Sequence, residues 1–401
     1  MNHLADQGER DRIRTSLDET LVVEAAAGTG KTTELIRRLI NVLAEGRGTV
    51  QSVAALAFTE KAAGELKLRV RAGLEEERGC AFPGSPRRAH LDAALAHLEE
   101  ARISTIHGFC TDLLHERPVE ARVDPEFQVL SEVEAKALYA EAFGGWIQSK
   151  LEDPPEGIRR ALRRRASADP DGGASGRLRA AEWQLAMWRH LRARWRRVPF
   201  DRNACIDSVI PLLYDLADAA ITCSNPSDRL YHDLWPARRL SADIRLWERV
   251  EPRDYEGLEA VRTDLAGIHR FRQPRSGSED NYRGGMSRGE VLARHTRLLA
   301  ALDEFARRAD ADLAALLQRE LFECLDRFEE LKARAGVLDF VDLLLKTRDL
   351  VRDRRDLREA LQRRLTHIFV DEFQDTDPLQ AEILLLLAAD DPAVDLSLIH
   401  I

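Results

Sequence analysis

Two short stretches of the chain, 340 positions apart, carry side chains suited to phosphate and metal chemistry. The first reads Ala-Ala-Ala-Gly-Thr-Gly-Lys-Thr over residues 25–32 and follows the apolar run Leu21–Val23. In such a loop, backbone N–H groups and the next helix N-terminus bind phosphate oxygens, Lys31 reaches the β- and γ-phosphates, and Thr32 can hold Mg²⁺. We therefore expect a nucleoside triphosphate site formed by Ala27, Gly28, Thr29, Gly30, Lys31, Thr32 and Thr33.

The alternative for this stretch is a strand, turn and helix that carry Gly-Lys-Thr by chance. Two observations bear on it. Only seven of the 60 basic residues are lysine, so a lysine at position 31 indicates a need for a compact point charge. Against this, the full phosphate-loop pattern opens with glycine, and this chain has Ala25 there.

The second stretch is the apolar run Thr366–Val370, which ends at the acidic pair Asp371 and Glu372. Ligands of parallel α/β sheets bind at the carboxyl ends of the strands. Asp371 is placed to hold Mg²⁺ and Glu372 to orient or deprotonate an attacking water. An acidic helix cap after a strand is the alternative, and the sequence Gln374-Asp375-Thr376 that follows argues against it.

Both stretches require an α/β framework around them. The segments at 21–24, 53–58, 102–106 and 365–370 are predicted strands, and the helical stretches that follow them predict a parallel, doubly wound sheet. Asp377 and Pro378 are typical of a helix start. We expect a discontinuous α/β domain over residues 1–115 and 330–395, with an inserted helical subdomain over residues 116–329.

Composition narrows the class of protein. The chain has 401 residues, 44% hydrophobic content and a net charge of −9, as in ordinary globular proteins with two or three domains. It has no apolar run of 18 residues, no secretory signal at its N-terminus, and five scattered cysteines without a CxxC pair. We expect no membrane partner, no zinc or iron–sulfur site, and a cytoplasmic location.

One segment departs from the overall negative charge. Residues 158–198 contain twelve arginines against three acidic residues, with Trp183, Trp188 and Trp195 among them. A basic surface with interleaved aromatic rings suits a nucleic-acid backbone. The alternative is an amphipathic helix whose tryptophans face a core, because spacings of five and seven place the three rings near one helical face.

The motifs together resemble those of UvrD/Rep-type superfamily 1 DNA helicases, in the RecB/AddA-like branch of helicase–nucleases. The resemblance rests on the residues 25–32 loop, on Asp-Glu-Phe-Gln-Asp-Thr at 371–376, and on three further segments at 57–66, 104–110 and 338–344. It implies a RecA-like ATP-binding domain with Mg²⁺ and ATP as cofactors. It also implies an ATP-dependent 3′→5′ helicase acting on single-stranded DNA and duplex junctions in double-strand break repair. A possible partner is a second helicase–nuclease subunit.

Roles for individual residues come from the same resemblance. It implies that Phe58, Thr59, Thr105 and His107 face DNA, that Gln374 couples the γ-phosphate to the DNA site, and that Gln7 reads adenine. Simpler alternatives exist for five of these residues: a core position for Phe58, helix caps for Thr59, Thr105 and His107, and a surface polar residue for Gln374. We expect structural or capping roles for Asp339 and Asp342.

The family continues into a second RecA-like domain that the resemblance does not find here, so we expect this chain to be the N-terminal part of a longer helicase with weak activity alone. Residues 396–401 read as the translation of a sequencing-library adapter, and we expect them to be non-native. Two alternatives remain for function: a non-catalytic, helicase-fold DNA-binding subunit, and a phosphate-loop NTPase that does not act on DNA.

Overall fold

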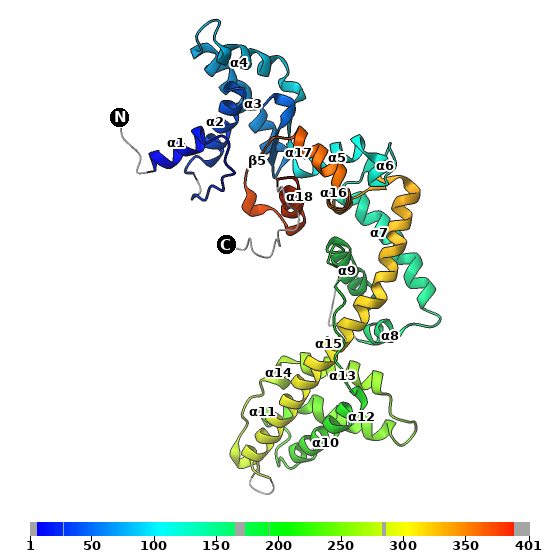
Figure 1. Cartoon of the computed structure of the whole chain (residues 1–401). Helices are drawn as coiled ribbons and strands as arrows, with labels where there is room; N and C mark the ends of the chain where they lie inside the picture. Colours follow the sequence, from blue (N-terminus) through cyan, green and yellow to red (C-terminus); the bar gives the residue numbers. More distant parts are fainter. Residues whose placement is uncertain (1–5, 27, 165–172, 192, 283–285, 389–401) are drawn as a thin grey trace. The chain divides into compact units, whose positions relative to one another are not determined.

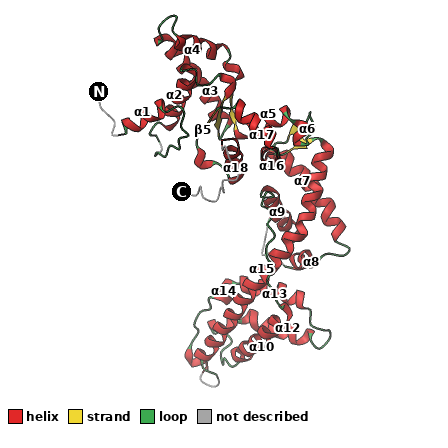
Figure 2. Cartoon of the chain, in the orientation of Figure 1, coloured by secondary structure: helices red, strands yellow, loops and turns green. Residues whose placement is uncertain are grey.

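The computed structural model describes residues 6–26, 28–164, 173–191, 193–282 and 286–388, in which the chain forms two compact units (Figure 1). Unit 1 comprises residues 1–135 and 333–401, and unit 2 comprises residues 136–332. The described residues are mostly helical, with a few short strands in unit 1 (Figure 2). Residues 396–401, expected to be non-native, lie outside the described residues.

The centre of unit 1 is a three-stranded parallel sheet in the order β2-β1-β5. Its strands are β1 (Val53–Ala57), β2 (Arg102–Thr105) and β5 (His367–Val370). Ala57 lies opposite Thr105, and Leu56 lies opposite Val370, so the three carboxyl ends share one edge. Every residue of β1 is buried, as expected for a central parallel strand covered on both faces.

Alternate residues of β1 enter two separate apolar cores. Val53 and Ala55 pack in one core with α2, α3 and α4, and Ala54 and Leu56 pack in the other with α5, α16, α17 and α18. The period of two along the strand thus places helices on both faces of the sheet. The helices are α2 (Lys31–Ala44), α3 (Glu60–Cys80), α4 (Pro86–Ala96), α5 (Ile106–Glu116), α16 (Phe340–Asp353), α17 (Arg355–Arg364) and α18 (Pro378–Ala388).

The remaining elements of unit 1 flank this sheet. Helix α1 (Gln7–Thr15) contacts α2. The two chain segments that lead into and out of unit 2 pair through two short parallel strands, β3 (Gln128–Val129) and β4 (Val337–Leu338), next to the short helix α6 (Pro118–Ala121). Asp339 caps α16 and Asp342 completes the capping box, so the structure confirms the capping role expected for both residues.

The strand predicted at residues 21–24 does not form, and this prediction was wrong. Residues 21–26 have no regular secondary structure, and the Val22 side chain is 91% exposed. An apolar run of three residues becomes a strand only when a neighbouring strand supplies hydrogen bonds, and none of the described strands pairs with it. The strands predicted at 53–58, 102–106 and 365–370 do form, each within two residues of the expected bounds.

Unit 2 consists of helices and connecting loops, and no strand forms in the part that the structure describes. The 48-residue helix α15 (Arg288–Ala335) contributes to both of its larger apolar cores. One core also includes Tyr139, Trp146 and Leu178, and the other includes Leu213, Leu230 and Phe271. The other helices are α7 (Glu132–Lys150), α8 (Glu156–Arg163), α9 (Gly173–Met187), α10 (Arg202–Ile221), α11 (Arg229–Asp233), α12 (Trp235–Trp247), α13 (Tyr255–Gly267) and α14 (His269–Arg272).

The amphipathic helix considered for residues 158–198 is only partly present. Helices α8 and α9 cover part of this range, but α9 ends at Met187. Trp183 packs in a core against Tyr139, whereas Trp188 and Trp195 are half exposed. The three rings therefore do not share one buried helical face, and the alternative that assigned all of them to a core was wrong.

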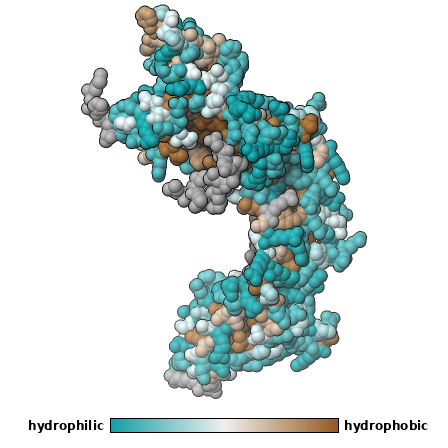
Figure 3. Space-filling view, in the orientation of Figure 1, coloured by the Kyte–Doolittle hydropathy of each residue, from teal (hydrophilic) through white to brown (hydrophobic). Residues whose placement is uncertain are grey.

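Surface and cysteine features complete the description. The visible faces of both units are largely hydrophilic (Figure 3). All five cysteines are free, so the chain has no disulfide to hold it together. Among the described helices, we find none with the length and apolar content needed to cross a membrane.

Candidate functional site

The loop before α2 has the backbone geometry that its glycines allow. Gly28 has φ of 78° and Gly30 has φ of 93°, a left-handed conformation that side-chain-bearing residues rarely adopt. Gly30 is the N-cap residue of α2 and has no side chain to bond the first N–H groups of that helix. These N–H groups are therefore oriented toward whatever lies in front of the helix, where an anion is favoured. Ala27, also predicted here, lies outside the described residues.

Lys31 is the first residue of α2, and its ammonium group folds back over the loop. Its Nζ donates a 3.1 Å hydrogen bond to the Ala25 carbonyl oxygen. This partner is neutral, so the bond orients the positive charge without cancelling it. Among the other predicted loop residues, the Thr29 hydroxyl donates to the Ala26 carbonyl at 2.7 Å and the Thr33 hydroxyl accepts from Arg69 at 2.9 Å.

The two predicted Mg²⁺ ligands meet, although 339 positions separate them. The Thr32 hydroxyl donates a 2.9 Å hydrogen bond to Asp371 Oδ2. Asp371 lies directly after β5, and its N–H donates to the Leu56 carbonyl at 2.9 Å, which extends the pairing of β5 with β1. The sheet therefore places this carboxylate at the end of its strand and next to the first turn of α2.

The donor atoms of this pair fit a magnesium ion in chemical type. A hydroxyl and a carboxylate are hard oxygen ligands, and Mg²⁺ is commonly held by one or two such groups together with phosphate oxygens and water. No group of three or more His, Cys, Asp or Glu side chains in the described residues forms a separate metal site. The arrangement thus suits a metal that arrives with a phosphate ligand.

Glu372 extends from an unusual backbone position. Its φ is 56°, in the left-handed region that a residue with a Cβ occupies at an energetic cost. Its side chain is exposed, and the Gln374 amide lies against its carboxylate. Glu372, predicted to act on the attacking water, and Gln374, predicted to couple the γ-phosphate to the DNA site, thus contact each other. Strained backbone at a polar, exposed residue is frequently found at functional sites.

An ionic network that the sequence motifs did not reveal ties α1 to this loop. Arg10 donates to the Thr29 carbonyl at 2.9 Å, and Arg14 makes two hydrogen bonds to Glu34, at 2.6 and 2.7 Å. The Glu34 side chain is buried, and the hydrogen bond from Arg14 is the largest of the effects that lower its pKa. The available signal was the four-residue spacing of Arg10 and Arg14, which places both on one face of a helix.

Among the described residues, no hydrogen bond joins the Gln7 side chain to the loop. Gln7 is the first residue of α1, and its side-chain amide donates to Asp11 one turn later at 2.8 Å. Its predicted contact with adenine stays a prediction.

The two segments expected to face DNA follow β1 and β2 at the same edge of the sheet. Phe58 is 51% exposed, which excludes the core position considered for it. Thr59 and Thr105 are the N-cap residues of α3 and α5, accepting bonds from the Ala62 and Gly108 N–H groups at 3.1 Å. Capping does not exclude a phosphate contact, because a helix N-terminus binds anions.

A side-chain bond and a ring contact hold these two segments in place. The Thr105 hydroxyl donates to Glu60 at 2.8 Å and so links the start of α5 to the start of α3. His107 lies one residue inside α5, so it does not cap the helix, and its ring makes an edge contact with Phe340 at 5.3 Å. Burial lowers the pKa of the His107 ring, and this effect outweighs the raising by the Asp377 and Glu60 carboxylates.

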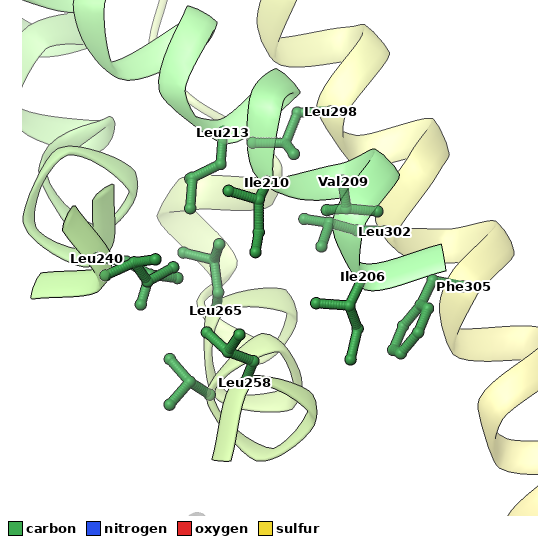
Figure 4. Close-up of a pocket in the computed structure, with 12 residues that line it drawn as sticks. Ile206, Val209, Ile210, Leu213, Leu240, Leu258, Leu265, Leu298, Leu302 and Phe305 are labelled. Atoms are coloured by element: carbon green, nitrogen blue, oxygen red, sulfur yellow. The ribbon is translucent and has the colours of Figure 1, made fainter. Parts of the chain in front are cut away.

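Unit 2 contains a cavity that lacks the chemistry of a site. It has a volume of about 40 Å³ and lies between α10, α12, α13 and α15 (Figure 4). Leu213, Ile210, Leu265 and Leu302 point toward one another across it, and every lining residue is apolar. A space of this size without polar groups is a packing gap in the core.

These features define a mostly helical α/β protein with oxygen ligands and a left-handed glycine loop at the carboxyl edge of a parallel sheet. The sequence matches the UvrD/REP helicase N-terminal domain family over residues 6–399, and the chain belongs to this family. The resemblance inferred from its motifs is therefore confirmed.

Curated relatives agree with this assignment. The chain is similar to the A subunits of ATP-dependent helicase/nucleases, at 25% identity in Listeria welshimeri and 27% in Moorella thermoacetica. These alignments cover 92% and 93% of the chain but only 32% and 29% of the relatives. The protein of the same name in Listeria monocytogenes is 34% identical over 132 residues, which cover 32% of this chain and 10% of that protein. The chain thus spans about a third of the length of the longer matches.

Proposed function

We propose that unit 1 is the ATP-binding motor lobe of a DNA helicase, with a RecA-like, doubly wound sheet and unit 2 as its inserted helical subdomain. The observation that carries this proposal is the 2.9 Å bond between Thr32 and Asp371. It brings the first turn after the glycine loop to the carboxylate at the end of β5, which is the pairing that a nucleoside triphosphate with Mg²⁺ requires.

Each residue of this site has a proposed task. Lys31 and the first N–H groups of α2 bind the phosphates, and Thr32 and Asp371 would hold Mg²⁺. When bound, the metal would neutralise negative charge on the β- and γ-phosphate oxygens. Glu372 orients and deprotonates the attacking water, and Gln374, which contacts Glu372, links the occupied nucleotide site to the DNA-facing residues.

DNA lies, in this proposal, across the edge formed by Phe58, Thr59, Thr105 and His107. An exposed aromatic ring can stack on an unpaired base, and helix N-termini can bind the neighbouring phosphates. The segment at Phe58 follows β1, which pairs with β5, and the segment at Thr105 follows β2, which pairs with β1. A change at Asp371 can therefore reach both segments through the sheet. The coupling of ATP to a single strand would follow this route.

The relatives' name and the family extend the proposal to the whole protein. We propose that it uses ATP to move 3′→5′ along single-stranded DNA and to unwind duplex ends in recombination and double-strand break repair, with a second helicase–nuclease subunit. The bound nucleotide is ATP with Mg²⁺. Translocation and unwinding belong to the whole protein, and for the 401-residue chain we expect binding of Mg·ATP with weak turnover.

Two measurements on this chain test the proposal: binding of a fluorescent ATP analogue with Mg²⁺, and binding of a labelled oligo(dT) of about 20 nucleotides, longer than one typical single-strand site. Lys31→Ala should weaken nucleotide binding at least tenfold, because the point charge on the phosphates is lost. Lys67→Ala is the matched control, because it removes a lysine of α3 that donates a hydrogen bond to Glu99. This variant should bind the nucleotide normally.

The outcomes separate the competing functions. A wild-type chain that binds oligo(dT) but not Mg·ATP would indicate a non-catalytic DNA-binding subunit. One that binds Mg·ATP but no DNA would indicate an NTPase of another kind. Normal nucleotide binding by Lys31→Ala would contradict the proposed site itself.

A further inference from the structure

The connection between α9 and α10 contains an extended segment that lies along the long helix α15. We call residues 193–200 the strap. In Figure 1 the chain between α9 and α10 passes beside α15, and hydrogen bonds and ring contacts show that the strap touches this helix. Its residues have no helix or strand assignment, so its position depends on these contacts.

The first anchor of the strap is the side chain of Gln318 on α15. This buried amide accepts a 2.7 Å hydrogen bond from the Trp195 N–H and donates one of 3.0 Å to the Ala193 carbonyl. The same amide thus bonds the backbone on both sides of Arg194, as a neighbouring strand would. A buried side chain with both of its amide functions used in this way fixes the local backbone.

Two further anchors lie toward the N-terminus of α15. Arg197 donates a 2.6 Å hydrogen bond to the buried carboxylate of Asp312, and the Phe200 ring contacts Phe305 at a centroid distance of 5.8 Å. The helix rises about 20 Å from Phe305 to Gln318. An extended chain from Ala193 to Phe200 covers about 23 Å, so the strap runs antiparallel to α15 with little slack.

The side chains between the anchors are not used by the fold. Trp195 is 55% exposed, and Arg194 and Arg196 on either side of it are exposed and have no ion-pair partner in the described part of the chain. Arginines nearby are different: Arg160, Arg164 and Arg197 all pair with carboxylates. The fold therefore orders a backbone that presents one aromatic ring and two uncompensated cations.

We propose that the strap binds single-stranded DNA, with Trp195 stacking on a base and Arg194 and Arg196 contacting the neighbouring phosphates. This rests on the proposed function, because that function supplies the DNA, but it places a second contact in unit 2. In an extended chain, residues i and i+2 lie about 7 Å apart on one side, and the residue between them lies on the other. The backbone of DNA can follow such a pair of cations while one base turns toward the ring.

Charge and exposure favour nucleic acid over a protein partner. The chain has a net charge of −9, whereas the strap carries two unpaired arginines beside an exposed tryptophan and is locally positive. Phosphates supply the missing negative charge, and unpaired bases supply a flat surface for the ring. A duplex hides its base faces, so the ring would have no partner there.

The test measures binding of the intact 401-residue chain to labelled oligo(dT) and to a duplex of the same length, without nucleotide and over a range of salt concentrations. Trp195→Ala should weaken oligo(dT) binding about tenfold and leave its salt dependence unchanged, since stacking releases no counterions. Trp195→Phe should restore most of the affinity. The double variant Arg194→Ala/Arg196→Ala should reduce the slope of log K against log salt by about 1.4.

Helix α12 offers a matched control of the same residue types. Trp235 is half exposed and lies under Arg239, which is in turn paired with Asp243. Trp235→Ala and Arg239→Ala should not change DNA binding. Melting curves of all variants should match the wild type, because none of these side chains is buried.

The possible results distinguish this proposal from the proposed function. If strap variants bind oligo(dT) as the wild type does while Phe58→Ala binds weakly, the strap proposal fails and the motor-lobe site stands. If the wild type binds no oligo(dT), both fail. A loss confined to the duplex overturns the assignment to single strands, and unchanged binding of both DNAs would leave the strap as a surface for a protein partner.

Discussion

The Thr32 hydroxyl donates a 2.9 Å hydrogen bond to the Asp371 carboxylate and so joins the two ends of unit 1 across 339 positions of sequence. Neither residue could be assigned to a common site by spacing alone. The parallel sheet makes the contact, because β5 returns beside β1 and ends next to the loop before α2. A hydroxyl and a carboxylate held this way are ready to share a divalent cation.

The first prediction concerns this pair. Thr32→Ala should weaken Mg²⁺-dependent ATP binding about tenfold, because it removes one hydroxyl ligand and leaves Asp371 without its partner. Thr32→Ser keeps the hydroxyl and should bind normally. The control is Thr111→Ala, which removes a hydroxyl bonded to the His107 carbonyl in α5. Titration of the ATP analogue with and without Mg²⁺ measures the effect, and equal loss in both conditions would argue against a metal role.

The second prediction uses the left-handed backbone of Glu372, whose φ is 56°. Glu372→Gly should raise the free energy of unfolding by about 1 kcal/mol, since glycine adopts this conformation without a Cβ clash. The same change removes the carboxylate proposed to act on water, so ATP turnover should fall while ATP binding persists. Arg122, with φ of 54°, is the control: Arg122→Gly should stabilise similarly and leave turnover unchanged. A stabilised and fully active Glu372→Gly chain would remove Glu372 from the mechanism.

The third prediction concerns the network between α1 and α2. Glu34 is 3% exposed and bonded to Arg14, so Glu34→Gln should lower the free energy of unfolding by about 1–3 kcal/mol at neutral pH. The folded-state pKa of Glu34 is lowered, chiefly by the hydrogen bond from Arg14. The ionised Glu34 carboxylate therefore stabilises the fold above the unfolded pKa, and this stabilisation is lost as the pH falls through the folded pKa. Denaturant unfolding should show the difference from wild type shrinking below pH 4.5, the ordinary pKa of the group.

The exposed pair of Arg12 and Glu19 is the control for this network. Both side chains are more than half exposed, so Glu19→Gln should change stability little at any pH. A Glu34→Gln effect no larger than that of Glu19→Gln would mean that α1 is not held to α2 by this carboxylate.

The fourth prediction tests the edge proposed to face DNA. Phe58→Ala should weaken binding of oligo(dT) by about 1–3 kcal/mol, the range typical of one base–aromatic stack, with no loss of stability because the ring is half exposed. Phe82 is 80% exposed in the connection after α3 and serves as the control. Phe82→Ala should leave both properties unchanged. Equal weakening by both changes would indicate a nonspecific effect of lost aromatic surface.

Much of unit 1 could be predicted from the sequence because its elements carry strong local signals. The segments that form β1, β2 and β5 are short, and helical stretches follow them, a pattern that predicts parallel strands. Asp377 was expected to cap α18, and its carboxylate accepts a 2.8 Å bond from the Gln380 N–H. The loop and the acidic pair are motifs whose residue types follow directly from phosphate chemistry.

What could not be predicted depends on contacts between distant residues. The run at 21–24 resembles β1 in composition, but a strand also needs a neighbour, which local sequence does not specify. The network of Arg10, Arg14 and Glu34 crosses two helices, and the strap is fixed by Gln318, more than a hundred positions away. In residues 158–198, the spacing of the tryptophans suits one helical face, but helix α9 ends at Met187, before two of the three rings.

The fifth prediction concerns a buried carboxyl group in unit 2. Glu182 on α9 is fully buried among Tyr139 of α7 and Cys324 of α15, and this burial raises its pKa to about 7, against a smaller lowering by the Cys324 thiol and the Tyr139 hydroxyl. The folded state therefore holds the proton more tightly than the unfolded chain. Stability should be highest below the unfolded pKa near 4.5. It should fall as the pH rises toward 7, because in this range the folded state binds more protons than the unfolded state.

Glu182→Gln replaces this acid by a neutral group of similar shape and so removes the cost of keeping it protonated or burying its charge. The variant should be more stable than the wild type by about 1–3 kcal/mol at about pH 8 and close to it at about pH 4. Denaturant unfolding at both pH values measures the difference. The exposed Glu141 on α7 is the control, and Glu141→Gln should show no such dependence on pH. If Glu182→Gln instead destabilises the chain at the higher pH, the carboxylate is charged in the folded state and held by a partner, and burial does not set its pKa.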